Sequence, residues 1–283
     1  MKTSIAQFCI LFSTAHLCSA EQAAPLSVTA QTTYGSYSGS DERKSLLSES
    51  VTARYAAEAF GATVNVRNWK LSRTGTLGNL NGIDTNMSLY VREKIAADGY
   101  VGTNLALTYL TGNDSNTDQK VVPYGAISGL MPDGKHYFDA GFAYMGYDDT
   151  SVQQYTTAYG VALFDRYLWS QTRLTHNRFS TEVQGKKSTT AVEERLTWYA
   201  VPSVFSLTLY GMAGERVYGY DPDLGIAYSL ADIQKLSAGL TAAWQMTPSL
   251  SLFGDVSHGT YEKRTINNSY SATYGTVGLT FKF

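Results

Sequence analysis

The side chains that do chemistry in most enzymes are few and scattered in this chain of 283 residues. Beyond residue 20 the only histidines are His136, His176 and His258. Serine hydrolysis needs a serine, a histidine and an orienting polar group within hydrogen-bond reach. His258 directly follows Ser257, and His176 directly precedes Asn177, but neighbouring residues of a strand point to opposite faces. Neither pair forms a catalytic group.

Metal and cofactor sites have no better support. The pair Asp148-Asp149 suits acid chemistry, but turns favour aspartate for conformational reasons alone. Residues 113–118 carry several oxygen ligands, yet they lack the spaced glycine and the terminal glutamate of an EF-hand loop. The sequence has no H-E-x-x-H, C-x-x-C or phosphate-binding loop. It therefore predicts that the protein is not an enzyme and holds neither a metal nor a cofactor.

The first twenty residues have the composition of a cleaved export signal. Lys2 precedes a mostly apolar stretch over 5–17, which is too short for a permanent membrane span, and small residues end at Ala20. An N-terminal core helix is the alternative, and a lipid anchor on Cys18 is disfavoured because Ala15-His16-Leu17 lacks the small residues that a lipid-attachment site needs. We expect a signal peptide at 1–20 and a single domain at 21–283. Cleavage would remove Cys9 and Cys18, which excludes disulfides and thiolate sites.

The remaining composition points to strands at a membrane. Of the 22 basic residues Lys2 lies in the signal, which leaves 21 against 24 acidic ones, so binding of nucleic acid is not expected. No apolar run reaches the ~18 residues of a transmembrane helix. The 21 tyrosines and 25 glycines suit short strands that meet a membrane interface. Trp169, Trp198 and Trp244 near one rim and Trp69 near the other are expected to form aromatic girdles.

Apolar and polar residues alternate with a period of two. In one segment Ile83, Met87, Leu89 and Val91 share a face, and the residues between them are mostly polar. An amphipathic helix would repeat its apolar residues at intervals of three and four instead. The same alternation recurs in segments that begin near Leu26, Val101, Phe138, Tyr155, Phe205, Leu236 and Leu250. A soluble sandwich has such strands too, so the connectors decide.

Short and long connectors take turns along the chain. Short turns are expected at 60–61, 98–99, 132–134, 165–166, 201–203 and 247–249, and longer polar connectors at 38–45, 72–82, 111–119, 147–152, 177–188, 216–233 and 261–268. The pattern predicts an all-β fold, a transmembrane up-and-down antiparallel β-barrel of fourteen strands. Twelve strands are the alternative, because residues 121–131 are apolar on both faces and the connector 216–233 could hide or replace strand residues.

The end of the chain supports a location in the bacterial outer membrane. Leu279, Phe281 and the terminal Phe283 share one face of the last strand. This end resembles the C-terminal signature by which outer-membrane barrels are recognised by their assembly machinery. We expect these three residues to be an assembly signal, with that machinery and outer-membrane lipid as partners.

The stretch 177–283 resembles the YaiO family of outer-membrane β-barrels. The resemblance lies in the order of its motifs: a polar linker ending at 185–188, a strand over 193–200, Gly214-Glu215-Arg216, a strand over 240–244, a turn at Pro248 and a close at 281–283. Such barrels are similar to the pores of exopolysaccharide export systems. The resemblance therefore implies movement of polysaccharide across the outer membrane. Those pores often carry a periplasmic helical scaffold, which would here be a separate protein.

Residues opposite the lipid face should line the lumen and determine what passes through it. The predicted set is Arg54, Glu58, Arg67, Asp84, Tyr90, Arg92, Lys94, Tyr137, Asp139, Arg173, Glu193, Arg195 and Asp255. Six basic and five acidic members favour a pore for a hydrophilic solute, and so even a balance does not identify the solute. An exported polysaccharide is what the resemblance to YaiO barrels implies. Tyr90 and Tyr137 would be able to stack on sugar rings. The alternatives are a closed, salt-bridged barrel that docks partners through its loops and, with less support, a barrel enzyme acting on lipid.

Overall fold

The computed structural model describes residues 26–96, 98–115, 117–228 and 231–283. The predicted signal peptide at 1–20 lies outside these residues. Within them, no helix is long and apolar enough to cross a membrane.

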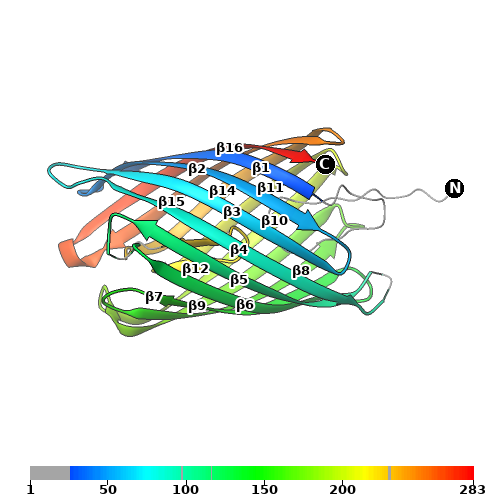
Figure 1. The fold of residues 1–283 in the computed structure, drawn as a ribbon, viewed down its shortest axis with the longest axis horizontal. Helices are drawn as coiled ribbons and strands as arrows, with labels where there is room; N and C mark the ends of the chain where they lie inside the picture. The colour runs from blue at the N-terminus through cyan, green and yellow to red at the C-terminus, as the bar shows by residue number, and fades with distance from the viewer. Residues whose placement is uncertain (1–25, 97, 116, 229–230) are drawn as a thin grey trace.

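Fourteen antiparallel strands close into a single barrel, and each strand pairs with its neighbour in sequence until the last meets the first (Figure 1). This confirms the predicted fold and rules out twelve strands, because the doubtful sixth segment is a regular strand. The barrel strands are β1 (Leu26–Ser38), β2 (Arg43–Ala56), β3 (Phe60–Arg73), β4 (Leu80–Lys94), β5 (Tyr100–Gly112), β6 (Lys120–Leu130), β7 (His136–Gly146), β8 (Ser151–Leu163), β9 (Leu168–Val183), β10 (Lys186–Val201), β11 (Phe205–Arg216), β14 (Ile233–Thr247), β15 (Leu250–Lys263) and β16 (Asn268–Lys282).

The seam between β1 and β16 closes the barrel and removes the free edges. Val28 pairs with Phe281, and the amide of Phe283 donates to the carbonyl of Leu26 at 2.9 Å. On the inner face the hydroxyls of Thr29 and Thr280 lie 2.8 Å apart. In a closed sheet the backbone N–H and C=O groups of every strand find hydrogen-bond partners on neighbouring strands. A sheet in lipid needs this closure because hydrocarbon offers no hydrogen-bond partners.

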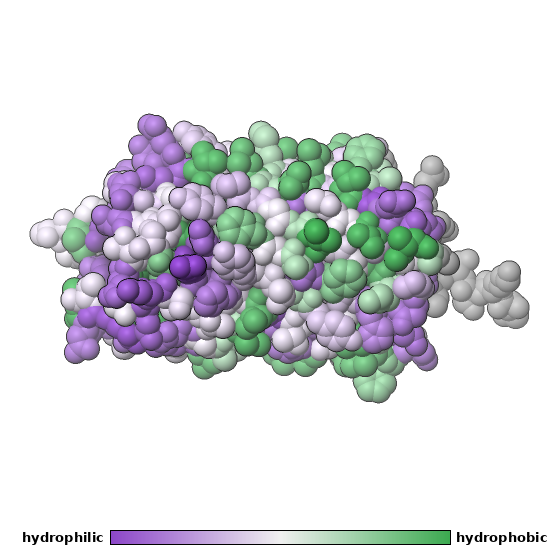
Figure 2. Space-filling model, turned by 90° about the horizontal axis from the view of Figure 1, so that it is seen from below, coloured by the Kyte–Doolittle hydropathy of each residue, from purple (hydrophilic) through white to green (hydrophobic). Residues whose placement is uncertain are grey.

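On the face seen in Figure 2, apolar side chains occupy the middle of the barrel and hydrophilic ones gather towards its two ends. Exposed large apolar side chains occur on each of the barrel strands, so the apolar band continues around the outside. The predicted outward residues Met87 and Leu89 are each 57% exposed, whereas the intervening Asn86 is 3% exposed. So many exposed large apolar side chains are typical of a surface that contacts lipid. Trp198 and Trp244 belong to this surface.

The other two tryptophans depart from the expected girdles. Trp69 and Trp169 line a cavity inside the barrel instead of facing lipid. Both lie near strand ends, as predicted. Their side chains point inward, however, because each occupies a position of the alternating strand pattern that faces the lumen. Trp69 donates its indole N–H to Asp84 at 3.0 Å, which gives this polar atom a partner inside.

The expected short turns lie at the barrel end that carries the C-terminus, here called the short-turn rim (Figure 1). The first of them falls at 57–59 instead of 60–61, because Phe60 and Gly61 already belong to β3. The opposite end is the loop rim. There the predicted connectors are shorter than expected, because the strands continue beyond the apolar band. The clearest case is 177–188, where β9 runs to Val183 and β10 begins at Lys186, leaving only Gln184-Gly185 as a turn with positive φ. Where the strands extend beyond the lipid, polar side chains on both faces of the sheet are compatible with continued hydrogen bonding between the strands.

One connector at the loop rim remains long, and it turns into the barrel. Within residues 217–232, the strands β12 (Gly219–Asp221) and β13 (Ile226–Tyr228) form a two-stranded antiparallel sheet. Residues 219–228 are called the inner hairpin below. Apolar side chains of this connector pack with those of the wall strands β5 to β9 into one buried cluster, which includes Val122, Tyr124, Met145, Phe179, Val217 and Tyr220. An apolar stretch of inner wall is thereby covered.

Candidate functional site

Residues 221–225 form the tip of the inner hairpin. The carboxylate Oδ1 of Asp221 accepts hydrogen bonds from the amides of Asp223 and Leu224 at 2.9 and 3.2 Å. The amide of Gly225 donates to the carbonyl of Asp221 at 2.9 Å, and Gly225 has a φ of +64°. Pro222 presets φ for a turn and aspartate caps turn amides, so the local sequence dictates this tip.

Two carboxamides attach the hairpin to the wall. Gln154 of β8 donates to the carbonyl of Tyr220 at 2.6 Å and accepts from its amide at 2.8 Å. Asn177 of β9 donates to the carbonyls of Val217 and Tyr218 at 3.0 and 2.9 Å. Both carboxamides are 1% exposed. They give the buried backbone of the connector the partners that it would otherwise lack.

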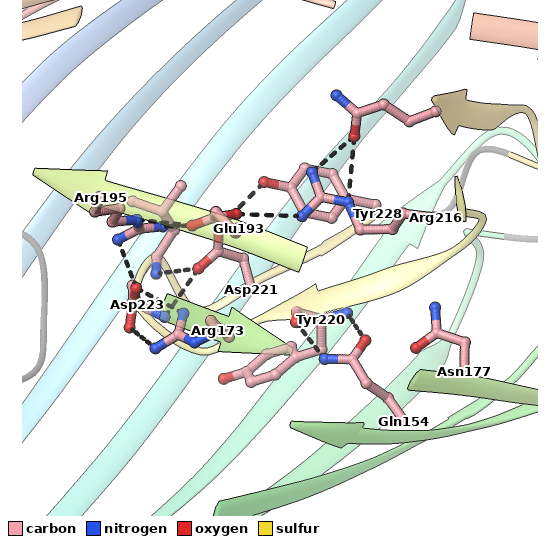
Figure 3. A network of polar contacts seen from close by, with 12 residues as sticks. Gln154, Arg173, Asn177, Glu193, Arg195, Arg216, Tyr220, Asp221, Asp223 and Tyr228 are labelled. Atoms are coloured by element: carbon pink, nitrogen blue, oxygen red, sulfur yellow. Dashed lines mark hydrogen bonds and ion pairs between the residues drawn. The ribbon is translucent and has the colours of Figure 1, made fainter. Parts of the chain in front are cut away.

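Two arginines of the wall hold the tip of the hairpin (Figure 3). Arg173 of β9 donates to both oxygens of Asp223 at 2.7 and 3.0 Å, and Arg195 of β10 donates to Oδ2 at 2.6 Å. The Asp223 side chain is 0% exposed. Arg173 also lies 3.6 Å from Asp139, and Arg195 lies 2.6 Å from Glu193. Bidentate pairs of this kind are strong and directional, so the tip has one defined position.

A cavity of about 420 Å³ lies between the hairpin and the opposite wall of the barrel. Its lining extends from Asp114 and Thr117 in the loop between β5 and β6 to Trp169 and Tyr199 near the short-turn rim. It therefore follows much of the length of the barrel. Aromatic side chains form much of this lining, among them Tyr37, Trp69, Tyr210, Tyr228, Tyr261 and Tyr274.

Arginines of the cavity are compensated by nearby carboxylates. The Nε atom of Arg67 donates to Asp84 Oδ2 at 2.8 Å, and the second oxygen of Asp84 accepts from Trp69. Near the loop rim, Arg43 lies 2.7 Å from Asp232. Arg216 lies 3.9 Å from Glu193 and also contacts the ring face of Tyr228, 5.0 Å from its centroid. These pairs hold the basic side chains of the cavity in place.

Further ion pairs connect the strands at the loop rim. Lys263 donates to Glu42 at 2.6 Å, and this hydrogen bond lowers the pKa of the Glu42 carboxyl. Glu215 lies 2.9 Å from Lys186 and 2.6 Å from Lys235, which lie on the two adjacent strands. The mouth of the barrel is thus held by charged contacts between strands.

The predicted lumen residues fall into three groups. Those that line the cavity are Arg67, Asp84, Glu193, Arg195 and Asp255. Asp139 and Arg173 lie with the hairpin tip, and the ring of Tyr137, 1% exposed, packs beside that of Trp169 with centroids 6.4 Å apart.

The third group lies towards the short-turn rim, with Arg54 near the end of β2. Arg92 lies near the ring faces of Tyr90 and Tyr100, 5.9 and 5.4 Å from their centroids. Glu58 departs from the prediction, since it lies in the turn after β2 with a side chain that is 79% exposed. It lies 3.5 Å from Lys94, the last residue of β4, so this pair belongs to the rim instead of the inner wall.

The most important site residues that sequence reasoning missed are Asp223, Gln154 and Asn177. Asp223 lies in a segment with ordinary turn residues, which does not reveal that the turn points inward. Gln154 and Asn177 had a weak signal, because strand alternation places them on the inner face of β8 and β9. That signal does not reveal their role, because the inner-face carboxamides of Asn65 and Asn86 bond to the side chains of Thr52 and Thr108 instead of to backbone.

The three imidazoles hydrogen-bond across neighbouring strands. The Nδ1 atoms of His136, His176 and His258 lie 2.6 to 2.9 Å from the hydroxyls of Tyr159, Thr190 and Thr273. Among the described residues, no cluster of three or more His, Cys, Asp or Glu side chains could hold a metal ion.

Comparisons with known proteins show the fold. No family model and no curated protein sequence matches this chain. The monoaromatic hydrocarbon channel CymD is similar in structure, with a TM-score of 0.60, 7% identity and coverage of 93% of this chain and 89% of that chain. A bacterial polysaccharide outer membrane secretin has a TM-score of 0.57 and 9% identity, with coverage of 93% of this chain and 100% of that chain. The COG4313 outer membrane channel from Pseudomonas putida F1 has a TM-score of 0.53 and 13% identity, with coverage of 96% of this chain and 99% of that chain. The chain thus has the fold of a bacterial outer-membrane β-barrel.

Proposed function

We propose that this chain is an outer-membrane channel for a hydrophilic solute. The observation that carries the proposal is the cavity beside the inner hairpin, which combines charged and hydroxyl side chains with aromatic faces inside a barrel whose outside is apolar. A lipid-facing exterior and a polar interior are what a pore for a water-soluble compound needs. The charged wall residues, Arg67 and Asp84 among them, would form a transverse field across the path.

An exported polysaccharide is the finer form of this proposal. Aromatic rings such as those of Tyr37, Tyr210 and Tyr274 along the cavity would stack on sugar rings. The resemblance of residues 177–283 to YaiO barrels points in the same direction. Further support is that one of the solved structures with a similar fold is described as a bacterial polysaccharide outer membrane secretin.

A closed barrel with a docking role is the second candidate. It is favoured by the inner hairpin, whose tip is locked by Asp223 and whose backbone is bound by Gln154 and Asn177. If this hairpin leaves no continuous path, the barrel would act through its loops. Conductance separates the two candidates.

Conductance of the refolded chain in a planar bilayer tests the proposal. We expect stable single channels, and we expect Asp84→Asn to lower the cation-to-anion permeability ratio about two-fold or more, because Arg67 then faces the path uncompensated. Asn keeps an acceptor for the indole N–H of Trp69. As a control, Asp98→Asn removes the same charge from an exposed ion pair with Arg166 at the short-turn rim. Absence of conductance from a correctly folded barrel would contradict the channel and favour docking.

The assembly signal is proposed to be the outer face of the last strand. Leu279, Phe281 and Phe283 are 39%, 47% and 67% exposed there, next to the seam with β1. We expect Phe283→Ser to lower the amount of folded barrel in the outer membrane about three-fold or more, because the assembly machinery must recognise an exposed aromatic end. Refolding of the purified variant in detergent should stay normal. The control Ile266→Ser changes an exposed apolar residue at the loop rim, and an equal loss there would refute the signal.

A further inference from the structure

Asp255 differs from the other carboxylates of the cavity in its partners. It lies on β15, and its Oδ2 accepts hydrogen bonds from the hydroxyls of Tyr210 at 2.8 Å and Thr241 at 2.7 Å. Both donors are neutral. Among the described residues no cation lies within ion-pair distance of Asp255, and its Oδ1 accepts no hydrogen bond. Asp84, in contrast, has both oxygens occupied by Arg67 and Trp69.

No arginine of the cavity is available to neutralise Asp255, and the imidazole of His258, the other basic group in the lining, hydrogen-bonds through Nδ1 to the hydroxyl of Thr273. The four arginines that line the cavity are already held by other carboxylates: Arg43 by Asp232, Arg67 by Asp84, and Arg195 and Arg216 by Glu193. Six carboxylates line the same space. The cavity therefore carries excess negative charge, and Asp255 is a fixed carboxylate with a free oxygen within it.

The surroundings of Asp255 match an organic cation better than a bare metal ion. Thr276 pairs with Asp255 across β15 and β16, Tyr274 pairs with Ser257 two residues further on, and Tyr210 bonds to Asp255 itself, so these hydroxyls and rings line the same part of the cavity. A metal ion prefers several charged or carbonyl oxygens, whereas an ammonium group needs one carboxylate and a few neutral acceptors. Aromatic faces add attraction for an ammonium group and for the apolar faces of a sugar ring.

We propose that Asp255 is the centre of a binding site for the primary ammonium group of a polyhydroxylated solute, such as an amino sugar. In this site the ammonium group pairs with Oδ1 of Asp255, while Tyr210 and Thr241 hold Oδ2 in place. The hydroxyl-rich wall and the tyrosine rings contact the remainder of the solute. The inference rests on the proposed channel function and names the class of solute that the cavity selects.

Binding of glucosamine and of glucose to the refolded full chain tests this site. The two sugars differ in one amino group, so the difference in their affinities isolates the contribution of Asp255. Quenching of tryptophan fluorescence reports binding, because Trp69 and Trp169 line the cavity. At pH 7 and constant ionic strength we expect glucosamine to bind about ten-fold more tightly than glucose, and Asp255→Asn to reduce that preference to about two-fold or less.

Controls separate the site from general charge effects and from the channel function. Asp98→Asn removes one negative charge at the rim and should keep the preference for glucosamine. Equal binding of the two sugars, no binding of either, or a preference that survives Asp255→Asn would overturn the inference. A conducting barrel without the preference would refute only this site, whereas a silent barrel that shows it would refute the channel and keep the site.

Discussion

Removal of the inner hairpin is expected to raise single-channel conductance about three-fold or more, because the hairpin occupies lumen space that ions would otherwise cross. The variant replaces residues 218–231 by a short Gly-Ser linker. The ends can be joined because Arg216 and Gln234 are already paired across β11 and β14. Val217 and Asp232 are kept, so that the apolar cluster and the ion pair with Arg43 lose as little as possible.

The control for this variant shortens a different connector at the loop rim. Replacing the 3-10 turn Arg264–Ile266 between β15 and β16 should leave conductance unchanged, because these residues do not line the cavity. Heat-modifiable migration on gels confirms that both variants fold. If the hairpin deletion conducts like the wild type, ions do not pass through the cavity beside the hairpin. The observation on which the channel proposal rests would then no longer support it.

The second large effect is expected from Asp223→Asn. The Asp223 side chain is 0% exposed and accepts from both Arg173 and Arg195, so the substitution leaves two guanidinium groups short of one negative charge. Breaking a buried ion pair by removing one partner costs about 3–5 kcal/mol. That cost should open the hairpin locally and leave the barrel closed, because the strands do not depend on this pair. Hydrogen exchange of residues 219–228 should therefore accelerate about 100-fold or more.

A matched substitution keeps this prediction falsifiable. Asp98→Asn removes a carboxylate that lies 3.0 Å from Arg166 at the exposed short-turn rim. Exposed pairs contribute at most about 1 kcal/mol, so exchange of the hairpin should not change. Unchanged exchange in Asp223→Asn would show that Gln154, Asn177 and the apolar cluster hold the hairpin without its tip.

The outer half of this protein was predictable from the sequence. Alternation over residues such as Ile83, Met87 and Leu89 placed the lipid face correctly, because successive side chains of a strand must point to opposite sides. The short turns marked by Pro132 and Pro248 set the strand order, since a short turn leaves antiparallel neighbours as the only choice. Strand count and closure followed from these local rules.

The inner half was decided by the tertiary structure. The alternation identified Arg173 and Arg195 as inward-facing, but nothing in their spacing indicated that they share Asp223, which lies 28 residues beyond Arg195 and 50 beyond Arg173. Whether the connector 216–233 enters the barrel depends on an apolar patch formed by five different strands and on carboxamides that meet its backbone. Alternation is a property of one strand and can be read locally. A ligand cavity is a property of many strands brought together, so its partners and its free carboxylate at Asp255 appear only after the barrel has closed.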